Sequence, residues 1–285
     1  MLGSLLRALV GRRSFRQLWA TAYCRSALAG MRALEIGGPS PMLGLAGQLP
    51  VYDVLSSLDN CLYSRSTIWT GDVQKGNTFV YLPGKEPGMQ VIAEASDLRA
   101  IPDASYDCVI ACHCLEHIAN PFAALGEWKR ILKWGGLLLL ILPHKEGTFD
   151  WRRPITPLQH MIDDFEQQIF EDDLTHLPEI LRLHDLSKDP GAGTGEQFRK
   201  RSLKNYIYRA LHHHVFDTIT AVMTVDYAGF QVLQVDPIKP CHIIILAQRT
   251  LESRENAPFM DGRAGFFRRS PFQLDRKLPS RPSLC

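Results

Sequence analysis

Short apolar segments alternate with amphipathic segments along most of this chain, and the alternation predicts its fold. We expect strands at 33–36, 50–55, 89–94, 108–112, 137–142, 230–235 and 242–248. Apolar residues spaced three and four apart predict helices at 121–133, 157–170, 174–186 and 215–229. Strands that alternate with helices in this way favour an α/β fold with a doubly wound, mostly parallel seven-stranded sheet. Residues 137–142 are so continuously apolar that we expect a central strand with both faces covered.

The first predicted strand ends in a turn that suits a ligand. Residues 32–40 read Arg-Ala-Leu-Glu-Ile-Gly-Gly-Pro-Ser, an apolar strand followed by two glycines. Glycine lets the backbone bend sharply and lets a ligand approach it closely. Ser40 and Pro41 suit the cap and the first position of a helix, so we expect a helix to begin there. A strand, a glycine turn and a helix start predict a nucleotide-type site.

The α/β pattern extends over residues 31–250 and is interrupted once. Residues 145–213 follow the fifth strand, are rich in Asp, His and Arg, and are too long for a plain connection. We expect them to form an insertion on the substrate side of the sheet, where the strands have their carboxyl ends and where such sheets bind ligands. Residues 251–285 hold few aliphatic side chains and predict a flexible basic tail.

The beginning of the chain is basic and amphipathic. Residues 1–30 predict a helix with Leu2, Leu5, Leu6 and Leu9 on one face, and they contain arginines and no acidic residue. Three interpretations stay open: a helix that packs on the domain, an organelle transit peptide, or a helix on a membrane surface. The last would give the protein a peripheral membrane contact.

Composition and charge narrow the class of protein. The seven cysteines are odd in number and include no C-x-x-C pair, which favours a reducing compartment, so we expect a cytoplasmic protein. The formal net charge of +2 conceals basic ends around a body, residues 35–248, that carries 18 basic and 26 acidic residues. An acidic body repels a phosphate backbone, so nucleic acid is not an expected partner. The acidic body and the polar segment 145–213 favour a polar small molecule or a glycan as the substrate. The oligomeric state is left open.

The order of motifs resembles that of the class I S-adenosylmethionine-dependent methyltransferases. The series contains Leu34-Glu35-Ile36-Gly37-Gly38, an acid after the second strand, Asp97-Leu98, the segment Tyr106 to His117, and Gly135-Gly136 before an apolar strand. Four motifs in this order, over about residues 31–248, are far more specific than one glycine turn. Segments 152–160 and 211–217 are similar to a bacterial type-11-like branch of these enzymes. The resemblance implies a Rossmann-like methyltransferase fold, an enzyme, and S-adenosyl-L-methionine as its cofactor.

The resemblance also implies which residues meet the methionine end of the cofactor. Gly37 and Gly38 would lie under the methionine portion, and Glu35 would organise the turn. The residues that would border the sulfonium are Cys112 and His113. This sequence departs from the family pattern, because Pro39 and Pro41 stand where the family usually has further glycines.

Acidic side chains are the implied contacts of the adenosine end. Asp59 would accept hydrogen bonds from the ribose hydroxyls, because it is expected at the end of the second strand, and Asp53 competes with it for this role. Asp97 would accept a hydrogen bond from the adenine amino group beside the backbone of Leu98.

Histidines are the candidates for acid–base chemistry. Methyl transfer to oxygen needs an acceptor held in line and a base that takes its proton, and a histidine is the natural base near neutral pH. All ten histidines lie between residues 113 and 242. The catalytic candidates, in order, are His144, His117 and His214. The expected substrate-binding residues are Arg153, which suits an anionic group, His160 and His184.

Two other classes of protein stay open. His113-x-x-Glu116-His117 has the H-x-x-E-H spacing of inverted zinc peptidases, which require both histidines on one helical face. His113 is expected at the end of a strand and His117 in the following helix, which disfavours a zinc hydrolase. The fold could also be a non-catalytic scaffold that binds the cofactor. We expect no required metal, because the consecutive histidines 212–214 cannot all face one ion.

Overall fold

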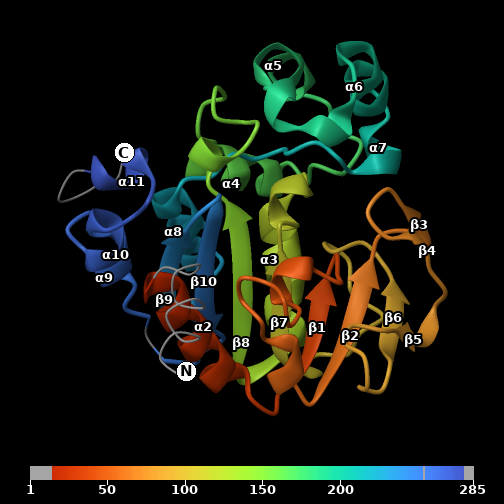
Figure 1. The fold of residues 1–285 in the computed structure, drawn as a ribbon, viewed down its shortest axis with the longest axis vertical. Helices are drawn as coiled ribbons and strands as arrows, with labels where there is room; N and C mark the ends of the chain where they lie inside the picture. The colour runs from red at the N-terminus through yellow and green to blue at the C-terminus, as the bar shows by residue number, and fades with distance from the viewer. Residues whose placement is uncertain (1–14, 253, 279–285) are drawn as a thin grey trace, which may run out of the picture.

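A single large sheet forms the centre of the protein (Figure 1). The computed structural model describes residues 15–252 and 254–278. The eight strands of this sheet lie in the order β5-β6-β2-β1-β7-β8-β10-β9. Their bounds, in chain order, are β1 (Arg32–Ile36), β2 (Ser57–Leu62), β5 (Gly76–Phe79), β6 (Gly88–Ile92), β7 (Tyr106–Cys112), β8 (Leu132–Pro143), β9 (Gln231–Ile238) and β10 (His242–Gln248). A separate pair is formed by β3 (Ser66–Thr67) and β4 (Gly71–Asp72).

The strand directions confirm the predicted α/β fold with a mostly parallel sheet. Strands β6, β2, β1, β7 and β8 run parallel to one another. Two strands run in the opposite direction: β10, which lies antiparallel to β8 and forms the predicted closing hairpin with β9, and the edge strand β5. The sheet has one strand more than predicted because β5, with the sequence Gly-Asn-Thr-Phe, lacks an apolar pattern and escapes detection.

The second predicted strand is displaced along the chain. Residues 50–55 contain a 3-10 turn at Tyr52–Val54, and the strand beside β1 is instead Ser57–Leu62. Asp59 and Asn60 lie inside that strand and interrupt its apolar pattern. The apolar residues before it serve a different purpose, because Val51, Tyr52 and Leu55 pack beneath the sheet as part of its core.

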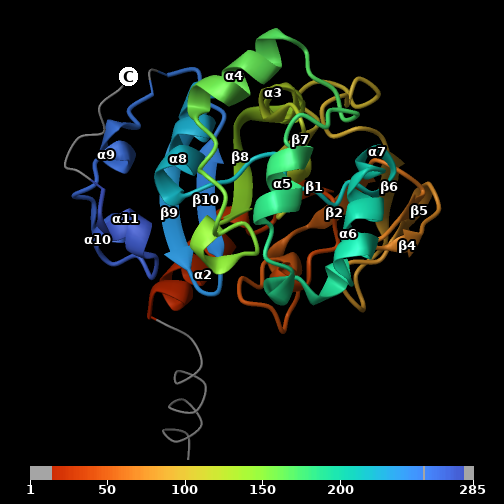
Figure 2. The same cartoon turned by 90° about the horizontal axis from the view of Figure 1, so that it is seen from above.

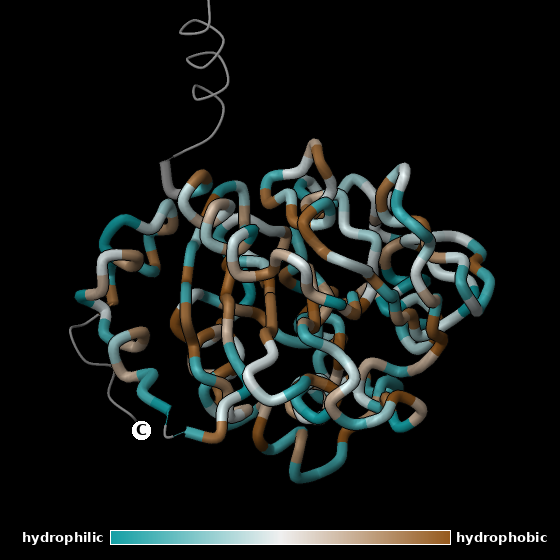
Figure 3. The backbone as a smooth tube through the Cα atoms, turned by 90° about the horizontal axis from the view of Figure 1, so that it is seen from below, coloured by the Kyte–Doolittle hydropathy of each residue, from teal (hydrophilic) through white to brown (hydrophobic). Residues whose placement is uncertain are grey.

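Helices cover both faces of the sheet (Figure 2). One face carries α3 (Pro121–Ile131) and α8 (Thr218–Tyr227), and the other carries α2 (Phe15–Leu28). The alternating side chains of β8 therefore enter two separate cores: Leu138, Leu140 and Leu142 one of them, Leu137 and Leu139 the other. This two-sided burial explains the continuous apolar run and accounts for the hydrophobic centre of the fold in Figure 3.

The segment predicted as an insertion lies above the carboxyl ends of the parallel strands (Figure 1). Its helices are α4 (Leu158–Glu166), α5 (Leu177–Leu183), α6 (Gly195–Ser202) and α7 (Asn205–Tyr208). It has a small apolar core of its own, formed by Leu177, Ile180, Ala192, Phe198 and Leu211. Most of its other buried side chains are polar or charged.

The terminal segments pack against the domain as far as they are described. In α2, Ala20, Cys24 and Leu28 are fully buried, which is the spacing of one helix face. The predicted helix over residues 1–30 extends into residues 1–14, which lie outside the described residues, so the membrane-surface contact stays a prediction.

The prediction of a flexible tail is wrong for residues 254–278. This segment forms α9 (Ala257–Met260), α10 (Gly265–Arg268) and α11 (Gln273–Arg276). Phe267, Phe272 and Asp275 are buried there. Composition missed this packing because a few aromatic side chains and one carboxylate hold the segment, in place of an aliphatic pattern.

Among the helices of the described ranges, none combines the length and the apolar character that crossing a membrane requires.

Candidate active site

The glycine turn after β1 is held by side chains beneath and beside it. The Tyr52 hydroxyl donates to Glu35 Oε2 at 2.7 Å, and the Ser40 backbone N–H donates to the Tyr52 oxygen at 2.6 Å. A Cβ atom added at Gly38 would lie 2.2 Å from Glu35 Oε2, so only glycine fits there while Glu35 keeps its place. Gly37 has a φ of +85°, which also favours glycine.

Burial changes the pKa of the Glu35 carboxyl group. The side chain is fully buried, and Oε1 has no hydrogen-bond partner among the described residues. Burial raises the pKa of Glu35 to about 7, although hydrogen bonds from Ser40 and Tyr52 oppose the rise. Glu35 is therefore a carboxyl group that titrates near neutral pH directly beneath the turn.

The helix expected at Ser40 is a single 3-10 turn, Pro41–Leu43, without a hydrogen bond from the Ser40 side chain. The following residues include Gly44, Gly47 and Pro50, which do not support a longer helix. The turn is instead fixed from β2, since Gly38 N–H donates to Asn60 Oδ1 at 2.9 Å and Asn60 Nδ2 donates to the Gly38 carbonyl at 3.0 Å.

The expectation that Asp59 ends the second strand is wrong. Asp59 is the third residue of β2 and lies opposite Leu34 in β1. Its carboxylate accepts hydrogen bonds within the fold, from Arg32 Nη2 at 3.0 Å, the Tyr106 hydroxyl at 2.9 Å and the Met89 N–H at 2.8 Å. The competitor Asp53 forms an ion pair with Arg25 at 2.6 Å. Neither carboxylate lies at the carboxyl ends of the strands, because Asp59 is inside β2 and Asp53 comes before it.

The loop after β6 presents two acids. Asp97 is bonded to Arg99 at 2.7 Å and its side chain is 44% exposed. The backbone N–H of its neighbour Leu98 donates to Glu127 Oε2 at 2.7 Å. Glu94 lies nearer to the strand end, and sequence reasoning missed it. Its position directly after the apolar run 89–93 was the available signal.

An arginine of the insertion closes over this edge. Arg209 Nη2 lies 2.8 Å from Glu94 Oε1, and Arg209 Nη1 lies 2.8 Å from Glu171 Oε2. The same guanidinium lies 5.0 Å from the ring centre of Tyr63, whose hydroxyl donates to the Ile207 carbonyl at 3.0 Å. The segment around α7 therefore lies against the carboxyl ends of β2 and β6.

A second group of side chains follows β7. His113 has a φ of +51°, and its Nε2 lies 2.7 Å from Nδ1 of His242. Three residues further on, Glu116 is fully buried and its Oε1 lies 3.6 Å from His113 Nδ1, beyond hydrogen-bond distance. His117 and His212 face the same carboxylate, with ring centres 4.6 Å apart. We call Glu116, His117 and His212 the edge cluster.

The charge states in the edge cluster differ. Burial, together with repulsion from His212, lowers the pKa of His117 to about 4, so this imidazole is neutral at physiological pH. Burial also opposes protonation of His212, but the neighbouring carboxylate of Asp150 outweighs it and raises the pKa of His212. For Glu116, the attraction of His113, His117 and His212 outweighs burial and lowers the pKa.

Most of the other predicted histidines are structural. His144 is completely buried, stacks on Phe272 with ring centres 3.9 Å apart, and lies 3.3 Å from Asp275 Oδ1. His214 is buried and bonded to the Ala119 carbonyl at 3.1 Å. Neither is placed to take a proton from a substrate, so the ranking of His144 first and the choice of His214 are corrected.

The predicted substrate-binding residues hold the insertion together. The Arg153 side chain is 1% exposed, and it pairs with Asp150 at 3.1 Å and Glu179 at 2.8 Å, so it offers nothing to an anionic substrate. His184 is buried between aromatic rings and lies 3.2 Å from Asp189. His160 is more open, with 39% of its side chain exposed, and its Nε2 lies 3.0 Å from His176 Nε2.

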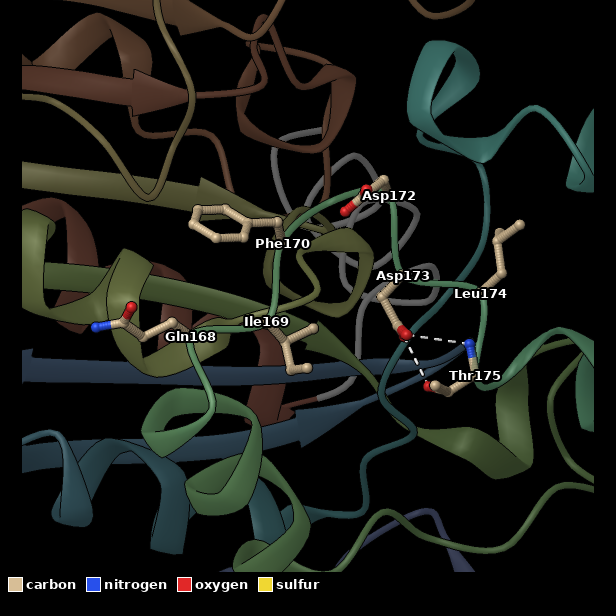
Figure 4. Close-up of a pocket in the computed structure, with 7 residues that line it drawn as sticks. All are labelled: Gln168, Ile169, Phe170, Asp172, Asp173, Leu174 and Thr175. Carbon is tan, nitrogen blue, oxygen red and sulfur yellow. Dashed lines mark hydrogen bonds between the residues drawn. The ribbon is translucent and has the colours of Figure 1, made fainter.

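A hollow of about 600 Å³ lies in the insertion (Figure 4). Residues 168–170 and 172–175 line it, and they include the exposed ring of Phe170 and the acids Asp172 and Asp173. Asp173 bonds to the N–H and hydroxyl of Thr175. None of the predicted site residues lines this hollow.

Comparison with known proteins finds a family model that matches part of the chain. Residues 74–140 match the family model described as a methyltransferase domain. No curated protein matches the sequence. The match covers only this part of the chain, which is therefore similar to methyltransferases, the class that the order of its sequence motifs also resembles.

Several solved structures are similar to this chain. A SAM-dependent methyltransferase from Aquifex aeolicus is 15% identical, with a TM-score of 0.42, over 87% of this chain and 98% of that one. An S-adenosylmethionine-dependent methyltransferase from Mesorhizobium loti is 11% identical, with a TM-score of 0.47, over 82% of this chain and 98% of that one. The structure of PigF with SAH is 15% identical, with a TM-score of 0.44, over 87% of this chain and 65% of that one.

One group at the carboxyl edge suits S-adenosylmethionine, the cofactor that the sequence resemblance implies. The Glu94 carboxylate can accept hydrogen bonds from adenosine, whereas the space beside Gly38 is taken by Glu35 and the space beside Gly37 borders Cys114. The residues after β2 are Tyr63, Ser64 and Arg65, so the acid that the family pattern has there is absent.

Proposed function

We propose that this enzyme transfers the methyl group of S-adenosylmethionine to a hydroxyl oxygen of a polar small molecule or glycan. The observation that carries the proposal is the edge cluster. It begins four residues after β7 ends, and Cys114, in the same segment, would lie 3.5 Å from a Cβ atom at Gly37. Acid–base groups therefore stand beside the turn that is expected to hold the reactive end of the cofactor.

The choice of oxygen follows from what the reaction needs. The bound cofactor supplies an activated methyl group, and the acceptor oxygen bonds to that carbon as its bond to sulfur breaks. A hydroxyl must lose its proton in this step, so the protein has to supply a base or another group that promotes the loss. The edge cluster is the set of buried polar groups at this position, and His117 is the one of the three predicted bases that belongs to it.

The hollow in the insertion supports a polar acceptor. Carboxylates and a hydroxyl from Asp172, Asp173 and Thr175 can bind the hydroxyls of a sugar or polyol, and the exposed ring of Phe170 can cover an apolar sugar face. Glu171, in the same segment, pairs with Arg209, which in turn pairs with Glu94 at the sheet edge. The hollow is thus connected to the predicted cofactor site by one ion-pair network.

Titration with S-adenosylhomocysteine tests the cofactor site. We propose Glu94 as the adenosine acceptor in place of Asp97, because Glu94 lies two residues after the end of β6 and Asp97 lies five residues after it. Glu94→Gln should therefore weaken binding by roughly ten- to a hundredfold, since one hydrogen bond to a charged group is worth about 1.5–3 kcal/mol. The matched control Asp97→Asn should bind like the wild type. A wild type that does not bind S-adenosylhomocysteine would contradict the assignment of the site, and loss of binding in Asp97→Asn alone would restore the original adenine contact.

An acceptor screen tests the chemistry. The protein is incubated with methyl-labelled S-adenosylmethionine and matched sets of hydroxyl, amine and activated-carbon acceptors. We expect label in polyols, sugars or other polar hydroxyl compounds. Label found only in amines or carbon acceptors would refute oxygen as the target, and label in a protein or an apolar quinone would refute the acceptor class.

A further inference from the structure

We infer that the edge cluster is a binding site for a divalent transition-metal ion, of the class of Zn²⁺ or Mn²⁺. The first reason is the state of Glu116. Its side chain is completely buried, and both carboxylate oxygens lack a hydrogen-bond partner among the residues that the structure describes. A buried carboxylate without partners is costly, and a cation removes that cost.

The second reason is the orientation of the two histidines. His117 Nδ1 lies 3.0 Å from the Leu211 carbonyl oxygen, which can only accept, so Nδ1 carries the proton when the ring is neutral. Its Nε2 then has a free lone pair, and this atom lies 4.0 Å from Glu116 Oε1. A histidine fixed through one nitrogen by a carbonyl, with the other nitrogen free, has the form of a metal ligand.

His212 repeats this arrangement. Its Nδ1 lies 2.5 Å from Asp150 Oδ2, and Asp150 is held in turn by Arg153. A carboxylate behind the histidine fixes the ring and increases the basicity of Nε2, as is usual for histidine metal ligands. The edge cluster therefore combines one carboxylate and two histidines. The Nδ1 atom of each histidine faces its own hydrogen-bond acceptor.

The spacing fits a shared ion. One ligand atom from each residue of the edge cluster lies within 4.8 Å of the other two. Two atoms bound to one tetrahedral ion at about 2.1 Å lie about 3.4 Å apart, so the cluster closes on an ion with side-chain shifts of at most about 0.8 Å. Two histidines with one carboxylate suit Zn²⁺, Mn²⁺ or Fe²⁺ and leave positions open for an oxygen ligand.

This proposal departs from our expectation that no metal is required, which nothing in the structure tests. That expectation considered histidines that are consecutive in the sequence, whereas the ligands come from two distant segments, after β7 and at the end of the insertion. If the proposed function holds, a hydroxyl bound at the open position would lose its proton more easily, because a cation stabilises the alkoxide. Metal binding itself does not depend on that role.

Calorimetric titration of the full-length, chelator-treated protein with Zn²⁺, and separately with Mn²⁺, tests the site. We expect one ion to bind per chain. Glu116→Gln and His212→Gln should each weaken binding at least a hundredfold. The control is His160→Gln, because His160, Asp164 and His176 form another candidate group that is separate from the edge cluster. This variant should bind like the wild type.

The possible results distinguish the edge cluster from the two other candidate metal-binding groups. No binding to the wild type, unchanged binding to Glu116→Gln, or loss of binding in His160→Gln would each overturn the proposal. A Co²⁺ spectrum of the wild type decides independently of any variant. The edge cluster predicts ligand-field bands without a thiolate charge-transfer band, whereas such a band would place the ion at the group of His113, Cys241 and His242.

Binding of S-adenosylhomocysteine to the metal-free protein tests the cofactor site separately. A protein that binds S-adenosylhomocysteine and no metal would refute the metal site alone, and the reverse result would refute the cofactor site alone.

Discussion

The sheet and the insertion that covers it are stabilised in different ways. Around β8 the buried side chains are aliphatic, and they fill both faces with contacts that have no preferred direction. In the insertion, buried Arg153 pairs with two carboxylates and donates to the carbonyls of His212 and His213. The first region needs volume to be filled, whereas the second needs every polar group to be paired. Function is expected at the border between the two.

The largest expected effect is the loss of Arg153. Arg153→Ala should lower the free energy of unfolding by about 3–5 kcal/mol, because it leaves Asp150 and Glu179 without their cation in a buried network. Urea denaturation measures this change. The matched control is Arg152→Ala, since that side chain is 47% exposed and should cost less than about 1 kcal/mol. Similar losses in both variants would contradict the polar network as a source of stability.

Truncating a side chain in the sheet should lower the free energy of unfolding somewhat less than Arg153→Ala does. A conservative replacement should also be tolerated better in the sheet than in the insertion. Leu140→Ala removes fully buried methyl groups from a central strand, and we expect a loss of about 2–5 kcal/mol. Leu140→Met should cost less than about 1.5 kcal/mol, because its volume is nearly kept. Arg153→Lys should lose most of what Arg153→Ala loses, since an ammonium cannot reproduce the planar set of donors. If Leu140→Met and Arg153→Lys both kept nearly all of the stability, the sheet and the insertion would not differ in how they are stabilised.

The pH dependence of Glu35 should give an intermediate effect. Its pKa is about 7 in the folded protein against 4.5 for the unperturbed group. Between these values the unfolded chain has released the proton and the folded protein has kept it, so the free energy of unfolding falls as pH rises, by up to about 3 kcal/mol. Glu35→Gln should flatten this part of the profile in urea denaturation from pH 4 to 8. A matched substitution at exposed Glu252 should leave it unchanged, and an unaltered profile in Glu35→Gln would disprove the shift.

The smallest effect is expected at the exposed pair of Asp97 and Arg99. The side chains are 44% and 86% exposed, so water and salt screen their attraction. Asp97→Asn should change the melting temperature by about a degree or less, within the range of ordinary surface substitutions. A large loss of stability would mean that the loop after β6 depends on this pair.

The periodicity of apolar residues predicted most strands of the sheet but not the residues that form the site. The apolar runs predict β1, β6, β7, β8, β9 and β10 because burial imposes a regular pattern on a strand. The same logic misplaced the second strand, since Asp59 and Asn60 are paired inside β2 and leave no apolar pattern. Arg209 and Glu171 could not be predicted at all, because their pairing joins residues far apart in the sequence. The histidines were visible as a group, but their roles depend on the atoms that each ring nitrogen faces.

The anchoring of His144 by Phe272 and Asp275 has a practical consequence for anyone who shortens this protein. A version ended near residue 250, where the α/β pattern stops, would remove the aromatic ring and the carboxylate that contact the first residue after β8. It would also remove the backbone donors, the N–H groups of Gln273 and Leu274, that hold Glu146. The start of the insertion would then lose its support, although the deleted residues lie more than a hundred positions away in sequence.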